Sequence, residues 1–186
     1  MKRVILCFMY LMSCCMLDAQ YVSKFKMNYD GTFTTQDGKR YDVVEVEGMS
    51  ATDLFDLVKK NIALAYRSPK DVESNVDDKI ICIYGYAPNC TYYTAPGVKF
   101  PLTFNYTIKF QFKDEKIRVD APNLYEMRGS VWETLQKVFR AHNIYSKNGV
   151  LSNKDNKRIT VTLLEEYFNG IINEIINGNE QANEDW

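Results

Sequence analysis

The chain of 186 residues has one histidine and almost no net charge. Lys and Arg number 23 against 24 Asp and Glu, so the formal net charge is −1. A single histidine excludes sites built from several histidines, such as many catalytic zinc sites. Binding of nucleic acid requires a clustered excess of Lys and Arg. We therefore expect no nucleic acid among the partners.

Long hydrophobic runs are absent, except for one apolar run at the N-terminus. Residues 4–17 (VILCFMYLMSCCML) are apolar apart from one serine, and they lie between Lys2-Arg3 and the small residue Ala19. This layout is typical of a secretory signal peptide. The run is shorter than the about 20 residues that a membrane-spanning helix needs. We expect residues 1–19 to be removed after Ala19. The mature protein would then be exported (periplasmic, outer-membrane-associated or secreted), without a transmembrane span.

Two alternatives remain open for the N-terminus. Residues 11–14 (LMSC) resemble a bacterial lipoprotein cleavage box, although Met12 departs from the small or branched residue usual there. Lipidation at Cys14 would anchor the protein to a membrane. The other alternative is an N-terminal anchor that is never cleaved.

Cysteine is scarce once the signal peptide is removed. Only Cys82 and Cys90 remain, and two cysteines in an oxidising compartment can form a disulfide. A tight turn centred on Tyr86 would place them opposite each other. The favoured interpretation is two free thiols, with Cys82 buried in an Ile-rich strand and Cys90 in a loop.

The first half of the mature chain predicts an arm, a strand and a helix. Residues 20–40 carry two Asp-Gly turn signals and are expected to form an N-terminal arm with short extended pieces. Residues 41–47 (YDVVEVE) favour a strand. Ser50 suits a helix N-cap, with Asp53 in the first turn. Apolar residues then recur at helical spacing; they are Leu54, Phe55, Val58, Ile62, Ala65 and Tyr66.

The clearest pattern is the alternation of apolar and polar residues over residues 102–113. It predicts a long strand with one apolar and one polar face. Further strands are expected over residues 79–87 and 116–120, with an edge strand over 124–128 and a loop over 88–101. The apolar positions of the long strand are Leu102, Phe104, Tyr106, Ile108, Phe110 and Phe112.

Helices are expected to cover the apolar face of this sheet. Residues 130–133 (SVWE) form a capping-box pattern before a helical stretch that ends near His142. Residues 147–158 predict a polar loop. Residues 163–176 carry a strong apolar face at helical spacing, closed by Gly178.

These elements predict an α+β fold with one antiparallel sheet in the order strand, helix, strands, helices. The helices are expected to pack on one face of the sheet. A single domain would span residues 41–178, and residues 179–186 would form a polar tail.

Five stretches carry a resemblance to a known family. They are residues 41–55 (YDVVEVEGMSATDLF), 66–68 (YRS), 77–81 (DDKII), 106–112 and 117–119. In its hydrophobic positions and turns the chain resembles the exported domain-of-unknown-function family 4468 of Bacteroidetes, which has a TATA-box-binding-protein-like (TBP-like) fold. The resemblance covers about residues 37–127. Signal peptides of the family typically end in Ala-Gln, as residues 19–20 do here.

The resemblance implies the TBP-like fold and a location in the cell envelope, but no active-site residue. It does not imply DNA binding. The protein that gives the fold its name is a tandem repeat that bends DNA through the minor groove, whereas this chain has no internal repeat. A fold by itself does not determine function.

Two catalytic arrangements are compatible with the residue types. Cys82 or Cys90 with His142 would make a nucleophile and base, although a cation at a helix C-terminus explains His142 as well. Glycosidases use two carboxyl groups that flank the scissile bond, so paired acidic residues are also candidates. Such pairs occur as well on the solvent-exposed faces of strands and helices. The pairs are Glu45/Glu47, Asp77/Asp78, Asp114/Glu115 and Glu165/Glu166. An envelope hydrolase is therefore the alternative hypothesis. No metal-ligand cluster, calcium loop or phosphate-binding loop is found, so no cofactor is expected.

An aromatic-rich stretch is the best candidate for a binding surface. Tyrosine offers rigid contact area with a polar tip, which suits sugar or protein surfaces, although aromatic residues also simply favour strands. The candidates are Tyr84, Tyr86, Tyr92, Tyr93 and Phe100. We expect a non-catalytic module that binds an envelope protein or a glycan. A structural or assembly component that self-associates through a sheet edge is a further alternative.

Overall fold

The computed structural model describes residues 20–66, 73–76, 79–129 and 134–178. In chain order its elements are β1 (Lys26–Met27), β2 (Phe33–Thr34), β3 (Tyr41–Glu45), α2 (Ala51–Ala65), β4 (Glu73–Val76), β5 (Ile80–Ala95), β6 (Val98–Lys113), β7 (Lys116–Asp120), β8 (Asn123–Arg128), α4 (Leu135–Ala141) and α5 (Asp155–Asn177).

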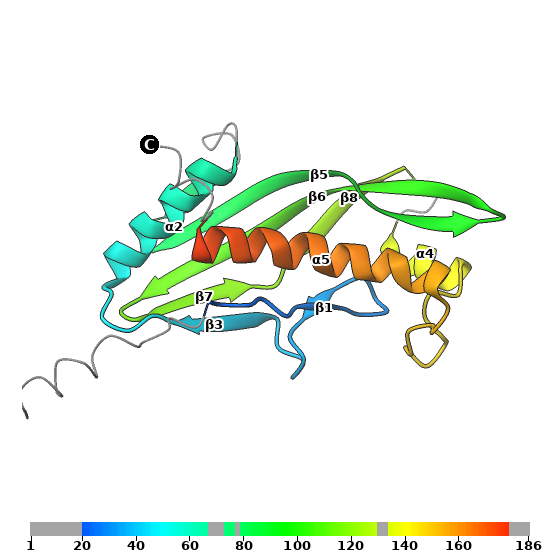
Figure 1. Cartoon of the computed structure of the whole chain (residues 1–186), viewed down its shortest axis with the longest axis horizontal. Coiled ribbons are helices and arrows are strands. Elements are labelled where there is room, and N and C mark those ends of the chain that lie inside the picture. The colour runs from blue at the N-terminus through cyan, green and yellow to red at the C-terminus, as the bar shows by residue number, and fades with distance from the viewer. Residues whose placement is uncertain (1–19, 67–72, 77–78, 130–133, 179–186) are drawn as a thin grey trace, which may run out of the picture.

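One antiparallel sheet organises the molecule. Its strands follow the order β3-β7-β6-β5-β4, and β8 pairs with β6 beyond the end of β7. Helix α5 lies across the sheet, and α2 packs beside its C-terminal end (Figure 1). This arrangement confirms the predicted α+β fold with helices on one face of an antiparallel sheet. Among the described residues, no helix is both long and apolar enough to cross a membrane.

The predicted alternation of β6 is confirmed, and it defines the core. Its six apolar side chains are at most 4% exposed. Aromatic edges of the helices contact this row: the ring centroids of Phe55 and Phe112 lie 5.5 Å apart, and those of Phe168 and Tyr106 lie 5.1 Å apart. Full burial of each such side chain contributes roughly 1.5–3 kcal/mol. The sheet and its helices are therefore stabilised as one unit.

Helix α2 starts as predicted. The side chain of Ser50 accepts a hydrogen bond from the Asp53 backbone, and the Asp53 carboxylate accepts one from the Ser50 backbone. This capping box satisfies two backbone donors that would otherwise lack helical partners.

The predicted loop over residues 88–101 is wrong. Strands β5 and β6 remain paired up to a turn at residues 96–97 and form one long hairpin. The register shifts between Ala87 and Thr91, where Asn89 adopts a φ of 49°. The prolines and asparagine of this stretch thus mark a bulge and a tight turn within a hairpin, because both kinds of residue suit such irregular positions.

Other boundaries differ from the expectation. Helix α5 begins at Asp155, so the predicted polar loop over 147–158 is too long by one helical turn. Strand β4 was not predicted. The described part of the helix that was predicted to end near His142 is α4, which begins after an N-cap at Thr134. The capping-box pattern at 130–133 lies outside the described residues, as do residues 1–19 and 179–186.

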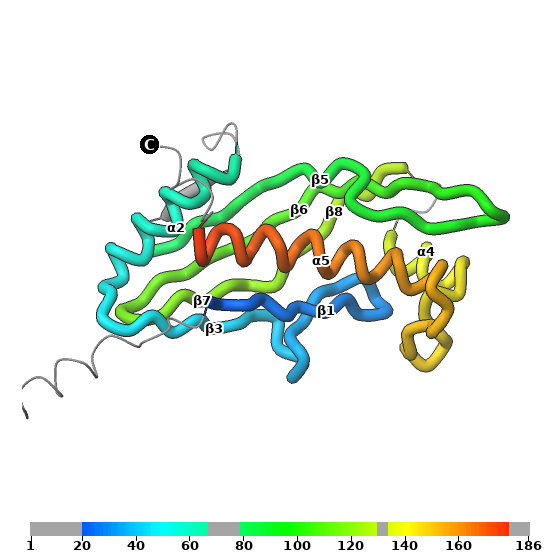
Figure 2. Tube along the Cα trace, in the orientation of Figure 1, coloured from blue at the N-terminus to red at the C-terminus, as the bar shows by residue number. Residues whose placement is uncertain are grey.

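Side chains of α5 bind the N-terminal arm through a regular series of hydrogen bonds, here called the arm ladder. Every fourth residue of α5 contacts every second residue of the arm. The pairs are Tyr21 with Asn177, Ser23 with Asn173, Phe25 with Asn169, and Met27 with Glu165. Four helical residues rise about 6.0 Å and two extended residues about 6.6 Å. The two repeats therefore stay in register over all four pairs, and the two segments run side by side (Figure 2).

The arm is thereby built into the core rather than lying on the surface. The alternating residues Ser23, Phe25 and Met27 are buried, as is Phe33 on β2. Asn169 makes the largest contribution to the ladder. Its amide donates to the Phe25 carbonyl (2.9 Å) and accepts from the Phe25 N–H (2.9 Å) and the Ser23 hydroxyl (2.6 Å).

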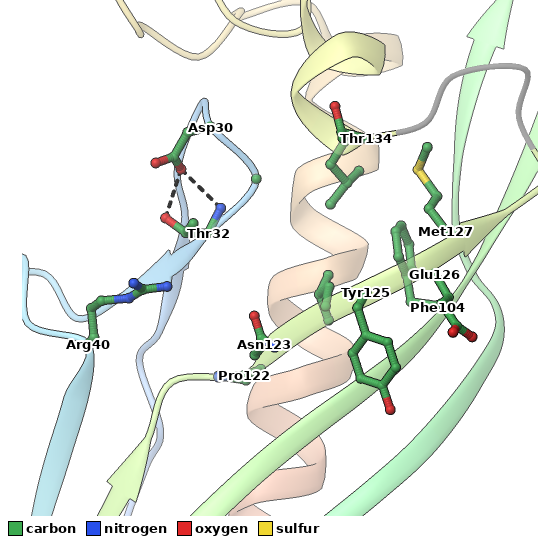
Figure 3. Close-up of a pocket in the computed structure, with 13 residues that line it drawn as sticks. Asp30, Thr32, Arg40, Phe104, Pro122, Asn123, Tyr125, Glu126, Met127 and Thr134 are labelled. Carbon is green, nitrogen blue, oxygen red and sulfur yellow. Dashed lines mark hydrogen bonds between the residues drawn. The ribbon is translucent and has the colours of Figure 1, made fainter.

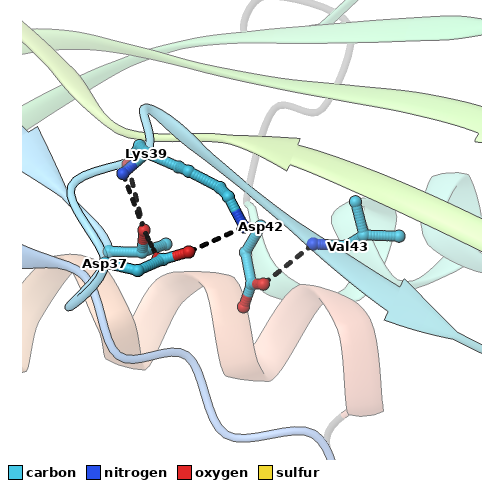
Figure 4. A network of polar contacts seen from close by, with 5 residues as sticks. Asp37, Lys39, Asp42 and Val43 are labelled. Carbon is cyan, nitrogen blue, oxygen red and sulfur yellow. Dashed lines mark hydrogen bonds and ion pairs between the residues drawn. The ribbon is translucent and has the colours of Figure 1, made fainter.

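A polar turn connects the arm to β3 (Figure 4). The Asp37 carboxylate accepts from the Thr35 hydroxyl (2.5 Å) and pairs with Lys39 (2.6 Å). The hydrogen bonds from Lys39 and then Thr35 lower the pKa of Asp37 to about 2. On β3, Asp42 accepts from the Tyr21 hydroxyl (2.9 Å), which fixes the first residue of the ladder to the sheet.

Gly85 provides the space for the largest core side chain of β6. The two strands place Gly85 directly opposite Tyr106. A Cβ atom at Gly85 would lie 2.0 Å from Cζ of Tyr106. The hydroxyl of Tyr106 is also hydrogen-bonded to that of Tyr66 (3.0 Å), so the ring has little freedom to move. Gly85 therefore allows the Tyr106 ring to lie against the backbone of β5, and the strand pairing continues through Gly85 without a register shift.

Replacement of Asn169 by alanine should lower the free energy of unfolding by about 2–4 kcal/mol, because it leaves the Phe25 N–H and C=O without partners. Urea denaturation of the purified protein measures this. The matched control is Glu166→Ala, an exposed residue of the same helix, which should change stability by less than about 0.5 kcal/mol. Equal effects of the two variants would refute a stabilising role for the arm ladder.

Two glycine substitutions should have opposite effects on thermal stability. Gly85→Ala should destabilise by about 1–3 kcal/mol, because the added methyl group collides with the Tyr106 ring. Gly170→Ala should stabilise by about 0.5–1 kcal/mol, because Gly170 lies within α5 with open space around its Cβ position and alanine favours helix. Thermal unfolding by circular dichroism tests both. A Gly85→Ala protein as stable as the unmodified one would contradict the packing described here.

Candidate functional site

The face of the sheet opposite the helices carries exposed tyrosines and polar side chains. We call it the open face. In an antiparallel sheet, residues directly opposite each other point to the same side. Two adjacent rows therefore run across β5, β6 and β8: Tyr86, Asn105 and Tyr125, and then Tyr84, Thr107 and Asn123. Exposed fractions are 56% for Tyr86, 50% for Tyr84 and 38% for Tyr125.

The five predicted binding residues do not form one surface. Tyr84 and Tyr86 lie on the open face. Tyr92 also points to that side of the hairpin, where the Lys99 ammonium lies 4.5 Å from its ring centroid. Tyr93 and Phe100 lie on the opposite side and stack on each other with centroids 5.1 Å apart.

His142 belongs to this second aromatic cluster. Its ring stacks on Tyr93, with centroids 4.3 Å apart, at the C-cap of α4. Burial and then the nearby Lys157 ammonium lower the pKa of His142. His142 thus lies at a helix C-terminus, as expected, but this environment favours the neutral ring over the cation.

The open face continues beyond the tyrosines into a charged region. Asp120 at the end of β7 pairs with Lys109 (2.7 Å) and with Arg118 (2.8 Å). The guanidinium of Arg118 lies 4.1 Å from the ring centroid of Tyr41 on β3. One carboxylate and one aromatic ring thus hold two cations in place beside the row that contains Tyr84.

A hollow of about 360 Å³ opens at this point on the open face. Strand β6 pairs with β7 through residues 110–113 and with β8 through residues 103–107. Residues 108 and 109 lie between these two ladders. The hollow is formed where the partner of β6 changes, and its polar and aromatic lining residues include Arg40, Tyr84, Thr107, Lys109, Arg118 and Asn123.

A second hollow, of about 280 Å³, adjoins the first at Arg40 and Asn123. It lies between the arm and β8 (Figure 3). On the arm side, Asp30 is held by hydrogen bonds from the N–H and hydroxyl of Thr32 (3.0 and 2.7 Å). Glu126 on β8 accepts from the Asn105 amide (2.5 Å). The carboxylates here are already engaged in hydrogen bonds within the protein.

The two cysteines are free thiols. The alternative of a disulfide required a tight turn at Tyr86 and is wrong, because Tyr86 lies within β5 opposite Asn105. Cys82 and Cys90 therefore lie eight residues apart along one strand, about 26 Å by strand rise, whereas a disulfide needs Cα atoms within about 7 Å.

The structure does not bring a thiol and the imidazole together as a catalytic pair. Cys82 lies on the open face, and His142 stacks on Tyr93 on the other side, eleven residues further along β5. Cys90 packs against the core, and burial raises the pKa of its thiol to about 11. A thiol that ionises only at such a pH is a poor nucleophile at neutral pH.

Of the six carboxylates in the described pairs, four have structural partners. Glu45 pairs with Lys116 (3.4 Å), whereas Glu47 lies beyond the end of β3. Asp114 and Glu115 accept hydrogen bonds from the backbone around the start of α2, at Ala51 and Gly48 respectively. Asp77 and Asp78 lie outside the described residues.

Glu165 and Glu166 have different environments on α5. Glu165 accepts from the Met27 N–H in the arm ladder (2.8 Å), while Glu166 is exposed. Burial raises the pKa of Glu165. Within the part of the chain that the structure describes, no group of three or more His, Cys, Asp or Glu could hold a metal ion.

Sequence reasoning found Tyr84 and Tyr86 but missed the residues that surround them. Tyr125 and Arg118 reach the same face only through strand register, and Arg40, directly before β3, lines the hollow beside them. The alternating stretch 102–113 could have indicated this surface, because its polar side chains must all lie on the face opposite its apolar ones.

Comparison with known proteins gives structural neighbours. No protein-family model matches the chain, and no curated protein matches it. A TBP-like protein from Parabacteroides distasonis is 15% identical, with a TM-score of 0.44 over 75% of this chain and 92% of that one. A DUF4468 family protein from Bacteroides ovatus is 13% identical, with a TM-score of 0.46 over 84% and 94%. The family name and the fold name of these neighbours match the resemblance seen in the sequence.

The stability contributed by Glu165 should depend on pH. Its folded-state pKa is raised, so the folded chain holds the proton more tightly than the unfolded chain. Stability is therefore lost as the pH rises from the unfolded value, about 4.3, through the folded one. Glu165→Gln should gain stability relative to the unmodified protein between pH 4 and pH 7 in urea titrations. Glu166→Gln controls for removal of one charge from α5. A gap between Glu165→Gln and the unmodified protein that stays constant over this range would contradict the burial of Glu165.

Proposed function

We propose that this chain is a non-catalytic, exported binding module whose open face binds a glycan of the cell envelope. The observation that carries the proposal is the pair of rows in which exposed tyrosines flank the polar side chains of Asn105 and Thr107. Tyrosine rings offer flat apolar surface, and the amide and hydroxyl groups offer hydrogen bonds beside it. Sugar rings present both kinds of surface.

The spacing of the tyrosines supports a glycan. Tyr86 and Tyr125 lie two strand spacings apart across β6, about 10 Å, and Tyr84 lies in the next row along β5. The three rings therefore border a polar strip about one strand wide, with Asn105 and Thr107 as its floor. A chain of sugar units can follow such a strip and contact several rings at once.

The charges around the tyrosines favour a glycan over a protein partner. The core of a protein–protein interface is depleted of Lys, Asp and Glu. The open face instead continues into Lys109 and Asp120, which lie next to the row of Tyr84. The exposed tyrosines lie in a polar surface rather than in an extended apolar patch.

The positions of the reactive side chains support a non-catalytic module. Cys82 and His142 are on different sides of β5, Glu45 pairs with Lys116, and Glu165 accepts from the Met27 backbone N–H. The exported location in the proposal is supported by residues 1–19, whose pattern is typical of a signal peptide. Cell fractionation of the native host tests that location separately.

The double variant Tyr84→Ala/Tyr86→Ala should weaken glycan binding by about 5- to 160-fold, since each of the two aromatic contacts is worth about 0.5–1.5 kcal/mol. The measurement is binding of the purified protein to a panel of immobilised neutral and acidic oligosaccharides, followed by titration of the best binder. The control is Tyr29→Ala, which removes a tyrosine of similar exposure (48%) from the arm.

Three results would overturn the proposed function. The unmodified protein could bind no oligosaccharide of the panel. The double variant could bind as well as the unmodified protein. The open face could instead bind single-stranded nucleic acid, for which a stacking surface beside cations is also suited; oligothymidylate is the probe for that outcome.

A further inference from the structure

We infer that the hollow between β7 and β8 binds an acidic sugar unit, a hexuronate, whose carboxylate is held by Arg40, Lys109 and Arg118. This inference rests on the proposed function and specifies its ligand class. The hollow measures about 360 Å³, within the range of about 300–1,000 Å³ usual for small-molecule sites. Its position at the break between two ladders leaves room beside β6 that a continuous strand would fill.

The charge of the hollow favours an anion. Three cationic side chains line it against one carboxylate, Asp120. The whole chain has a net charge of −1, so this local excess is a feature of the site rather than of the protein. A ligand carboxylate would restore the balance between the charges. It would lie where cations from three different segments, Arg40, Lys109 and Arg118, come together.

Asp120 positions two of these cations without using up their hydrogen-bonding capacity. It pairs with the Lys109 ammonium (2.7 Å) and with Nε of Arg118 (2.8 Å). An ammonium has three donors and a guanidinium five. Both groups therefore keep donors for a ligand. The Arg118 side chain is further fixed by its stacking on Tyr41, which reduces the entropy lost when it binds.

The remaining lining residues suit a sugar ring rather than a bare anion. Tyr84 provides an aromatic surface, and its ring is half exposed. Thr107 and Asn123 provide a hydroxyl and an amide in the same row of the sheet. An inorganic phosphate or a simple carboxylic acid would use the cations alone. A hexuronate would use the cations for its carboxylate, the tyrosine for its ring and the polar pair for its hydroxyl groups.

The hollow is also continuous with the tyrosine rows of the open face. Tyr84 belongs to both, and Tyr86 and Tyr125 lie in the next row. A uronate unit in the hollow would therefore place its neighbouring sugar units over the tyrosines. This geometry predicts that an acidic oligosaccharide binds more tightly than a single uronic acid.

The test compares matched acidic and neutral sugars by isothermal titration calorimetry. The acidic probes are trimers of galacturonate and of mannuronate, and the neutral probes are galactotriose and mannotriose with the same linkages. The unmodified protein should bind at least one acidic trimer ten or more times as tightly as its neutral counterpart. This preference should shrink as the salt concentration rises from 50 to 500 mM, because screening weakens exposed ion pairs.

Substitutions in the hollow test whether its cations cause the preference for acidic trimers. Lys109→Gln and Arg40→Gln should each reduce the preference for the acidic trimer at least threefold, and the double variant should reduce it to about one. Lys113→Gln is the matched control, because Lys113 lies on the same strand and the same face opposite Lys116. It should keep the preference. Thermal unfolding of each variant checks that the fold is retained, and Arg40→Gln stays informative if a change at Lys109 disturbs Asp120.

The outcomes separate this inference from the proposed function. If neutral and acidic trimers bind equally and binding depends on Tyr84 and Tyr86, the hexuronate inference is wrong and the glycan proposal stands. If no sugar binds, both are wrong. An equal loss of preference in Lys113→Gln would show that general charge and not the hollow is responsible. Tighter binding of oligothymidylate than of either acidic trimer would also overturn the inference.

Discussion

The burial of one face of β6 is the constraint on which the rest of the structure depends. β6 is the central strand, and its six apolar side chains lie beneath α2 and α5. Side chains of a strand alternate between faces, and a shift of one residue would exchange the two faces. Burial of Tyr106 and Ile108 therefore forces Asn105, Thr107 and Lys109 onto the open face. The same hydrophobic pattern thus determines both the core and the composition of the candidate site.

Helix α5 both covers the sheet and binds the N-terminal arm, but its sequence clearly indicates only the first of these roles. Its apolar side covers the sheet, as predicted. Its polar side looks like an ordinary solvated face, yet Asn169, Asn173 and Asn177 bind the backbone of the arm. When an extended segment is buried, its backbone N–H and C=O groups lose their hydrogen bonds to water and need partners within the protein. The arm obtains these partners from a helix rather than from a neighbouring strand, which is why periodicity alone did not reveal its attachment.

Strands 41–47, 102–113 and 116–120 and the helix after Ser50 could be predicted because their signals are local. Alternation, helical spacing and a capping box each depend only on nearby residues. The β5–β6 hairpin beyond residue 88 was missed because prolines and a bulge interrupt its pattern. Because this stretch was predicted as a loop, Tyr92 and Tyr93 were assigned to one surface. They are consecutive residues of a strand and therefore point to opposite faces. The open face needed strand register, which joins β3, β5, β6, β7 and β8 and has no local signal.

The hollow follows from the unequal lengths of these strands. β6 is 16 residues long, whereas β7 has five and β8 has six, so two short strands share one edge of a long one. Residues 121–122 separate them, and Pro122 has no N–H to donate to a ladder. The break exposes part of β6 beside Lys109, and Asp120, the last residue of β7, holds the cations at its rim. The break that ends β7 and starts β8 thus also places cationic hydrogen-bond donors around the hollow. A small anionic ligand requires this arrangement.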